Sequence, residues 1–297
     1  MKKISPALVA VLVAGLLPLA STEAQWKKTS GRTVYLEDES VRECHQINFY
    51  WSDRIVARGE QERTVARTSS PLRVRPSGNG GVHVYGTDGN EYRIKACAVA
   101  AARSAGDADA MVDRIALNVT GSDVNVSGPG KDSDWSVFII VAAPRDSSVD
   151  LESYNGPVAV RDFSGSVVAR SHNGPVSLSS VTGRVRARTE NGPISVGGNS
   201  GGDFDLDLQN GPLDVNLRGQ RWEGRLEGRT QNGPISLSLP ADYKSGVRVD
   251  TSEHSPVTCR APQCRTTPRT WEHPSRIQFG DSPVVRLSTV NGPVTVR

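Results

Sequence analysis

The segment Gly198–Gly202 frames Ser200 with glycines much as a trypsin-like protease frames its nucleophile. Such a serine needs a histidine as general base and an aspartate that orients this histidine. The upstream histidines, His45, His83 and His172, lack the small neighbouring residues that typically precede a catalytic histidine. The segment also falls between one expected strand and the glycine that opens the next. We therefore predict that Ser200 is a turn residue and that the chain has no catalytic residues.

Asp203, Asp205 and Asp207 have the spacing that begins a calcium-binding EF-hand loop. That loop requires glycine at its sixth position, where this chain has Leu208. In a strand, alternation would instead place these carboxylates about 6.8 Å apart on one side. We predict that they pair with arginines of neighbouring strands, Asp205 with Arg186, and that they bind no calcium.

Four residues near the C-terminus have the ligand types of a zinc site: His254, Cys259, Cys264 and His273. In an exported protein, cysteines more simply form disulfides. Cys259 and Cys264 would close a small loop, which leaves Cys44 to pair with Cys97. We predict two disulfides, no metal and no cofactor.

The N-terminus has the pattern of a secretory signal peptide. Lys2 and Lys3 precede an apolar run over 7–20, and small and polar residues follow it up to Ala24. The run is short for a membrane span, which needs about 20 apolar residues. We predict that residues 1–24 are removed, that the mature chain has no membrane span, and that the protein is periplasmic, on the cell surface or secreted.

The charge of the chain is nearly balanced. It has 35 Lys and Arg residues against 32 Asp and Glu residues, a net charge of +3. A balance of this kind gives no general attraction to nucleic acid or to other polyanions. We therefore expect no nucleic-acid partner.

A repeated phrase, Asn-Gly-Pro followed by alternating apolar residues, dominates the second half of the chain. Its six asparagines, the repeat corners, are Asn155, Asn173, Asn191, Asn210, Asn232 and Asn291. A degenerate copy lies at 253–259, and an early copy begins at Asn79. Residues separated by two in the sequence lie on the same side of a strand, so each repeat predicts strand, corner, strand and corner.

One repeat cannot fold alone. It would bury about four apolar side chains at ~1.5–3 kcal/mol each, whereas ordering its backbone costs ~1–2 kcal/mol per residue. Stacked repeats share one core, and the proline after Asn-Gly argues against antiparallel hairpins. We predict an all-β fold, a right-handed parallel β-solenoid with coils of 18–22 residues, whose corner asparagines stack on one another. Stacking in chain order would also pair Glu227 with Arg248 and Arg229 with Asp250.

The predicted domains follow from where the repeat begins. Residues 25–60 carry no repeat and form an N-terminal segment or cap, and residues 61–297 form the β-solenoid. Apolar residues at helical spacing predict one short amphipathic helix near 106–116, with Asp107 as its N-cap. A cysteine-bearing insertion occupies 258–282.

The sequence NGGVHV at 79–84, the expected helix, the strand WSVFIIVAAP at 135–144 and the recurrent NGP coils together resemble the bacterial putative-adhesin β-solenoid family, a domain of unknown function. The resemblance covers roughly residues 60–297. It implies a surface or periplasmic location and no established catalytic residues. The insertion at 258–282 is less typical of the family.

We interpret the chain as a non-enzymatic, adhesin-like binding or scaffold protein whose partner is an envelope or surface ligand, either a glycan or a protein. Self-association through the edge of the terminal coil is a further expectation. The candidate partner face is a strip of small, mostly hydroxylic residues that includes Ser177, Ser195 and Ser236. The alternative function is a carbohydrate-active β-helix enzyme, a polysaccharide lyase or hydrolase. Short connections and paired charges argue against it.

Overall fold

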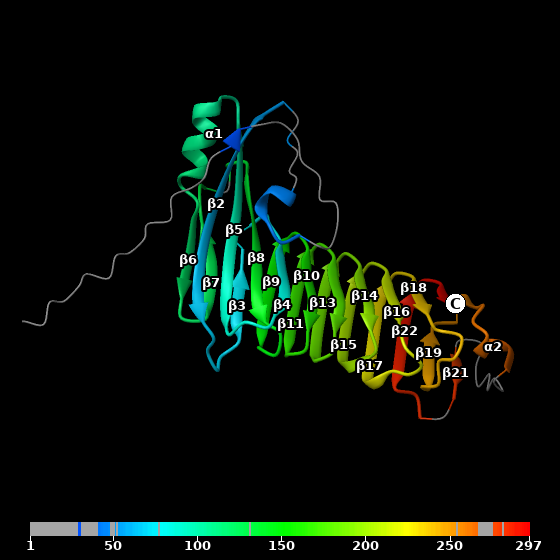
Figure 1. Cartoon of the computed structure of the whole chain (residues 1–297). Helices are drawn as coiled ribbons and strands as arrows, with labels where there is room; N and C mark the ends of the chain where they lie inside the picture. The colour runs from blue at the N-terminus through cyan, green and yellow to red at the C-terminus, as the bar shows by residue number, and fades with distance from the viewer. Residues whose placement is uncertain are drawn as a thin grey trace, which may run out of the picture.

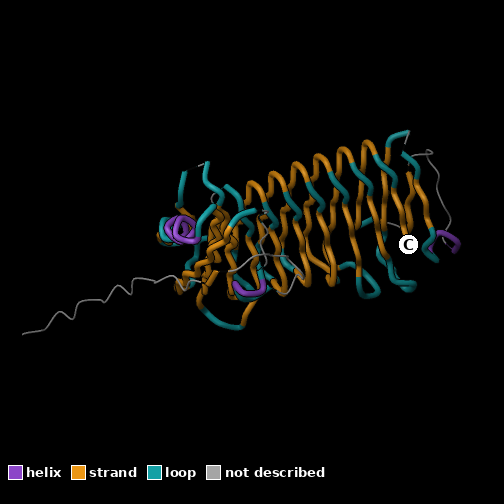
Figure 2. The backbone as a smooth tube through the Cα atoms, turned by 90° about the horizontal axis from the view of Figure 1, so that it is seen from above, coloured by secondary structure: helices purple, strands orange, loops and turns teal. Residues whose placement is uncertain are grey.

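The computed structural model describes residues 29–30, 41–47, 51, 53–76, 78–130, 132–253, 255–266, 276–280 and 282–297. Two large β-sheets face each other and enclose one long apolar core (Figures 1 and 2). The predicted signal peptide, His254 and His273 lie outside the described residues. No helix in the described part of the chain is long and apolar enough to cross a membrane.

The first sheet has twelve strands, in the spatial order β1-β2-β5-β8-β4-β10-β12-β14-β16-β18-β23-β20. Their bounds are β1 (Thr29–Ser30), β2 (Ile55–Ala66), β4 (Val82–Thr87), β5 (Glu91–Ala102), β8 (Trp135–Pro144), β10 (Val158–Phe163), β12 (Val176–Val181), β14 (Ile194–Asn199), β16 (Leu213–Leu217), β18 (Ile235–Ser238), β20 (Val257–Cys259) and β23 (Val294–Val296).

The second sheet has eleven strands, in the order β21-β19-β22-β17-β15-β13-β11-β9-β3-β7-β6. Their bounds are β3 (Leu72–Arg75), β6 (Ala116–Thr120), β7 (Asp123–Ser127), β9 (Val149–Asn155), β11 (Val167–Asn173), β13 (Arg184–Asn191), β15 (Gly201–Asn210), β17 (Glu223–Asn232), β19 (Val247–Thr251), β21 (Arg276–Phe279) and β22 (Val285–Asn291). The helices are α1 (Ala105–Val112), α2 (Gln263–Thr266) and the 3-10 helix η1 (Cys44–Gln46).

The predicted fold class, a parallel β-solenoid over 61–297, is wrong, because both sheets are mixed. In the first sheet β5 pairs antiparallel with β2 and with β8, and these long strands stand above the rest of the molecule (Figure 1). In the second sheet β6 pairs antiparallel with β7, and β21 with β19. The cause is local in the case of β6 and β7: a two-residue turn with Gly121 at φ 59° joins them as a hairpin, and neither strand carries an Asn-Gly-Pro corner.

The strands between 149 and 238 pair in parallel and in register within these mixed sheets. Val158 of β10 lies opposite Val176 of β12, and β11 pairs with β9 and β13. The corner asparagines form a ladder of side-chain hydrogen bonds. Each Nδ2 donates to the Oδ1 of the previous corner at 2.8–3.1 Å, from Asn291 through Asn232, Asn210, Asn191, Asn173 and Asn155 to Asn79.

The repeats do not stack in chain order at the C-terminal end. Strand β22 lies between β17 and β19 (Figure 1). In the other sheet, β23 lies between β18 and β20. Glu227 therefore faces Arg286 and Arg229 faces Ser288, so the predicted pairs with Arg248 and Asp250 are wrong. The last repeat ends in an intact Asn-Gly-Pro corner that extends the asparagine ladder, whereas the copy at 253–259 has no asparagine and lies outside it.

A second set of hydrogen bonds closes most corners from the inside, and the exception is the corner at Asn210, where Leu208 takes the place of the hydroxyl residue. Buried hydroxyls two residues before a corner asparagine donate to the carbonyl of a corner glycine: Ser171 to Gly156 and Thr189 to Gly174, both at 3.1 Å. A buried carbonyl loses its hydrogen bond to water when the chain folds, and the bond from the hydroxyl replaces it. The in-register strands thus hold both their apolar and their polar interior groups in rows.

Helix α1 covers one face of the tall antiparallel strands, with Ala108 and Val112 packed against Ala57, Ala100 and Ala102. It ends earlier than the predicted range of 106–116. Ser104, and not Asp107, is its N-cap, because the Ser104 side chain accepts a hydrogen bond from the backbone N–H of Asp107 at 3.2 Å.

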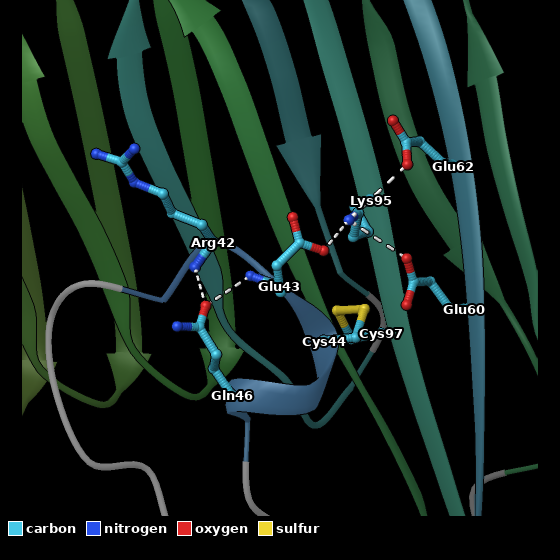
Figure 3. The surroundings of a disulfide bond; sticks show 8 residues. All are labelled: Arg42, Glu43, Cys44, Gln46, Glu60, Glu62, Lys95 and Cys97. Atoms are coloured by element: carbon cyan, nitrogen blue, oxygen red, sulfur yellow. Dashed lines mark hydrogen bonds and ion pairs between the residues drawn. A yellow bond between two sulfur atoms is a disulfide. The ribbon is translucent and has the colours of Figure 1, made fainter. Parts of the chain in front are cut away.

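Residues 41–47, which we call the N-terminal strap, lie across the outer face of the first sheet (Figure 3). The predicted disulfide between Cys44 and Cys97 fixes the strap to β5. Val41 and Ile47 pack there with Cys97 and Ile140. The second predicted disulfide, Cys259 to Cys264, is also present.

Removing the first disulfide should cost more than removing the second. Cys44 and Cys97 are 53 residues apart, so we expect the double variant Cys44→Ala/Cys97→Ala to lose roughly 2–4 kcal/mol of unfolding free energy. The matched control, Cys259→Ala/Cys264→Ala, opens a link across only 5 residues and should lose less. Urea unfolding of the two variants measures the difference. Equal losses in the two variants would contradict the expectation that the Cys44–Cys97 link contributes more than the Cys259–Cys264 link.

Candidate functional site

The outward residues of the first sheet form a row across its parallel strands. Each member lies directly opposite the next, in the order Ala159, Ser177, Ser195, Asp214, Ser236, Thr295 and Thr258. None of these residues is buried. We call this set the serine row. The three predicted partner-face residues, Ser177, Ser195 and Ser236, thus lie in one row, with Asp214 between the last two.

A shallow depression of about 330 Å³ lies over the middle of the serine row. Ser195, Asp214, Asn216 and Ser236 line it together with Arg297, whose guanidinium donates to the Ser236 hydroxyl at 2.8 Å. Arg297 is not among the residues predicted from the sequence. Strand alternation could have indicated it, because Arg297 lies two residues after Thr295 and so on the same outward side of the strand. The row offers hydroxyl groups, one carboxylate and one guanidinium, which can bind polar groups.

The serine row continues toward β5 beneath the N-terminal strap. Ala159 faces His83, His83 faces Ile140, and Ile140 faces Lys95. The guanidinium of Arg42, from the strap, lies 5.0 Å from the centre of the Tyr85 ring. The strap therefore closes one end of the row and leaves the other end open.

Lys95 is held by a cluster of glutamates under the strap (Figure 3). Its ammonium group pairs with Glu43 of the strap, with Glu60 at 3.3 Å and with Glu62 at 3.9 Å. Partial burial by itself lowers the pKa of Lys95, but the hydrogen bond and charge of Glu43 and the charge of Glu60 outweigh it and raise the pKa above its ordinary value. Lys95 thus stays charged and ties the strap to two strands.

His83 is 8% exposed, and its Nε2 atom is buried without a hydrogen-bond partner. Burial lowers the pKa of His83 to about 4, with smaller contributions from the charges of Arg161 and Arg42. The imidazole is therefore neutral at pH 7. It is a packed residue between the strap and the sheet.

The outer face of the second sheet carries paired charges. Arg186 lies opposite Asp205 with 3.4 Å between Nε and Oδ2, which confirms the predicted contact. Arg188 pairs with Asp207 at 4.0 Å. A shallow depression of about 730 Å³ on this face is lined by Arg186, Asp205 and neighbouring charged residues. No group of three metal-ligating side chains occurs among the described residues.

Ser200 lies exposed in the turn between β14 and β15, and its carbonyl accepts a hydrogen bond from the Glu223 N–H at 3.0 Å. His172, one of the histidines considered as its base, instead pairs with Glu190 at 2.7 Å. Cys259 and Cys264 are joined as a disulfide and are not available as thiolate ligands. Ser200 thus occupies a turn, and the disulfide uses the two thiols that a zinc site at this place would need.

Comparison with known proteins finds similar solved structures but no matching family. No family model matches the sequence, and no curated protein matches it. Several solved structures are similar. A putative cell adhesion protein from Clostridium sporogenes is 12% identical with a TM-score of 0.31, and the match covers 80% of this chain and 98% of that chain. A putative adhesin from Bacteroides fragilis is 10% identical with a TM-score of 0.41, covering 80% and 97%.

A putative lipid binding protein from Parabacteroides distasonis is also similar, at 9% identity and a TM-score of 0.35, covering 80% of this chain and 96% of that chain. Identities and TM-scores this low carry no argument about the function of this chain. The names of these neighbours are mainly those of adhesion proteins. The function of this chain therefore has to be argued from its own surfaces.

Proposed function

We propose that this protein is an exported, non-enzymatic binding or scaffold protein of the cell envelope or surface, and that the serine row contacts its partner. The observation that carries the proposal is the alignment of Ser177, Ser195 and Ser236 in one row of small residues, none of which is buried. Neighbouring strands are about 4.8 Å apart, so the row from Ala159 to Thr258 is roughly 29 Å long.

A rigid, flat row suits an extended ligand. Short side chains lose little conformational entropy when they are covered, which lowers the cost of binding. The hydroxyl groups can donate and accept hydrogen bonds, as a glycan chain or the polar face of a protein requires. Two disulfides agree with an oxidising compartment outside the cytoplasm.

The alternative function, a carbohydrate-active enzyme, gains no support from the charged face. Glycoside hydrolysis needs one carboxylic acid that donates a proton and a second carboxylate near it. Arg225 and Arg229 engage both oxygens of Glu227, and Asp205 pairs with Arg186. These carboxylates are held by guanidinium groups and not presented to a substrate.

Self-association would use the terminal strands β20 and β21, and it stays a prediction.

We expect Ser195→Arg to weaken binding to isolated cell envelopes about tenfold, which corresponds to roughly 1.4 kcal/mol, because a long cation would stand in the middle of the flat row. The melting temperature should change by less than about 2 °C, because Ser195 lies on the surface. Co-sedimentation of the labelled protein with envelopes measures the binding.

The matched control is Ser166→Arg, which places the same side chain at a half-buried position before β11 on the second sheet. It should leave binding unchanged. If Ser195→Arg binds normally while Arg186→Ala or Asp205→Ala does not, the charged face is the partner face and the proposal is wrong.

A further inference from the structure

The outer face of the eleven-stranded sheet carries another depression besides the one lined by Arg186 and Asp205. It has a volume of about 780 Å³ and lies near the asparagine corners. One side is formed by the residues that immediately precede corner asparagines, Glu190, Gln209, Gln231 and Val290, and the other side includes Arg188, Asp207 and Arg229. We call it the glutamine groove. It runs across the strands, and it lies on the opposite sheet from the serine row.

Gln209 and Gln231 lie side by side on β15 and β17, because their neighbours Leu208 and Thr230 are aligned in register. Both are exposed, and no hydrogen bond holds either side-chain amide within the described structure. The contrast with the next residue along each strand is sharp. Asn210 and Asn232 use their amides to bond the corner ladder. The two glutamines thus offer free donors and acceptors about 4.8 Å apart.

Most of the charges around the groove already have a partner. Asp207 pairs with Arg188 at 4.0 Å and Arg229 engages Glu227, while Glu190 contacts His172 at 2.7 Å. A polyanion would meet the acidic groups and a polycation would meet the guanidiniums, so neither is complementary. The backbone of these strands is used in the sheet, which excludes a peptide that adds as a further strand.

An aromatic ring lies just beyond one end of the groove, because the register of β9 and β11 places Tyr154 beside His172, which contacts Glu190 of the groove. Tyr154 precedes the first corner of the array and is 56% exposed, and its ring stacks on His172 with 4.6 Å between the ring centres and 11° between the planes. A ring held in this way presents a rigid apolar face at low entropic cost. The apolar C–H face of a sugar ring can pack on such a surface while its hydroxyls bond the amides.

We infer that the glutamine groove binds an uncharged linear polysaccharide that lies across the strands. Gln209 and Gln231 hydrogen-bond its hydroxyls, and Tyr154 packs against a sugar ring at one end. This goes beyond the role proposed for the serine row, because it gives the protein a second binding surface on the opposite sheet. The protein would then bridge a polysaccharide and an envelope partner.

The test is affinity electrophoresis of the full mature chain in native gels that contain hydroxyethyl cellulose, galactomannan or pullulan, with alginate as the polyanionic comparison. At least one uncharged polymer should retard the protein. Gln209→Ala/Gln231→Ala should raise the dissociation constant about tenfold, because two hydrogen-bonding amides are lost. Tyr154→Ala should raise it several-fold.

Two control variants show whether retardation depends on the glutamine groove. Gln220→Ala removes an exposed glutamine from the loop between β16 and β17 and should leave retardation unchanged. Ser195→Arg, on the serine row, should also leave it unchanged, so a failure of one surface is distinguishable from a failure of the other. Retardation by none of the three uncharged polymers, retardation by alginate alone, or unchanged retardation of the double glutamine variant would each overturn the inference.

Discussion

Gly211→Ala is expected to lower the free energy of unfolding by roughly 3–5 kcal/mol, from backbone overpacking together with a strained φ. Gly211 is a corner glycine with φ 153°, and a Cβ atom there would lie 2.1 Å from the carbonyl oxygen of Gly192 in the neighbouring repeat. The neighbour is backbone that is itself bonded into the stack, so it cannot move away cheaply. The two repeats would have to separate.

The matched control is Gly197→Ala. Gly197 lies on β14 without a positive φ, and a Cβ atom there would have no other atom within 4 Å, so alanine should be nearly neutral. Urea unfolding of both variants measures the difference. Equal stability of Gly211→Ala and Gly197→Ala would mean that the corners do not approach as closely as the structure shows.

A second large effect is expected from pH. The pKa of His83 falls from 6.5 to about 4 on folding, because the imidazole is buried and lies near Arg161 and Arg42. In the unfolded chain the His83 imidazole therefore binds a proton below about pH 6.5, whereas in the folded chain it binds one only below about pH 4. His83 favours the folded state in full above pH 6.5, and this contribution is lost as the pH falls through that window. At 1.36 kcal/mol per pKa unit it amounts to about 3 kcal/mol.

Urea unfolding between pH 7 and pH 4 tests this expectation. The wild type should lose about 3 kcal/mol more across the window than His83→Leu, in which an apolar side chain replaces the imidazole beside Ile140. Between pH 7 and pH 4.5, the leucine variant should therefore lose less of its unfolding free energy than the wild type loses. Parallel pH profiles for the two proteins would show that His83 is not buried in its neutral form.

The sequence predicted best where each repeat carries the same corner. From Asn155 to Asn232 the asparagines and the alternating apolar residues are intact, and the strands pair in register there. It failed for β2 and β5, which pair antiparallel over twelve residues although β3 and β4 separate them in the chain. No turn joins these strands directly, so no local signal indicated the pairing.

The order of the repeats at the C-terminal end was also beyond the sequence. Chain order suggested that the copy at 253–259 follows Asn232, but hydrogen bonding between intact corners favours Asn291 in that place. The surfaces show the same division. The serine row could be predicted from strand alternation. The glutamine groove could not, because it depends on which side-chain amides are left without a hydrogen bond. The covered end of the serine row could not be predicted either, because it depends on the strap that Cys44 and Cys97 hold in place.

Both proposed surfaces depend on one claim, that outward side chains of neighbouring strands align in rows in the spatial order of the sheets. In the first sheet Thr295 lies between Ser236 and Thr258. Adjacent strands are about 4.8 Å apart, and strands separated by one other strand are roughly 10 Å apart. Cross-linking paired cysteines with dibromomethane, which joins two thiols through one methylene, therefore reads the order directly.

We expect that Ser236→Cys/Thr295→Cys gives a cross-linked peptide by mass spectrometry and that Ser236→Cys/Thr258→Cys does not. The native cysteines do not interfere, because all four are in disulfides. A cross-link in the second variant and none in the first would contradict this claim, because the repeats would then stack in chain order and the rows would be built from different residues.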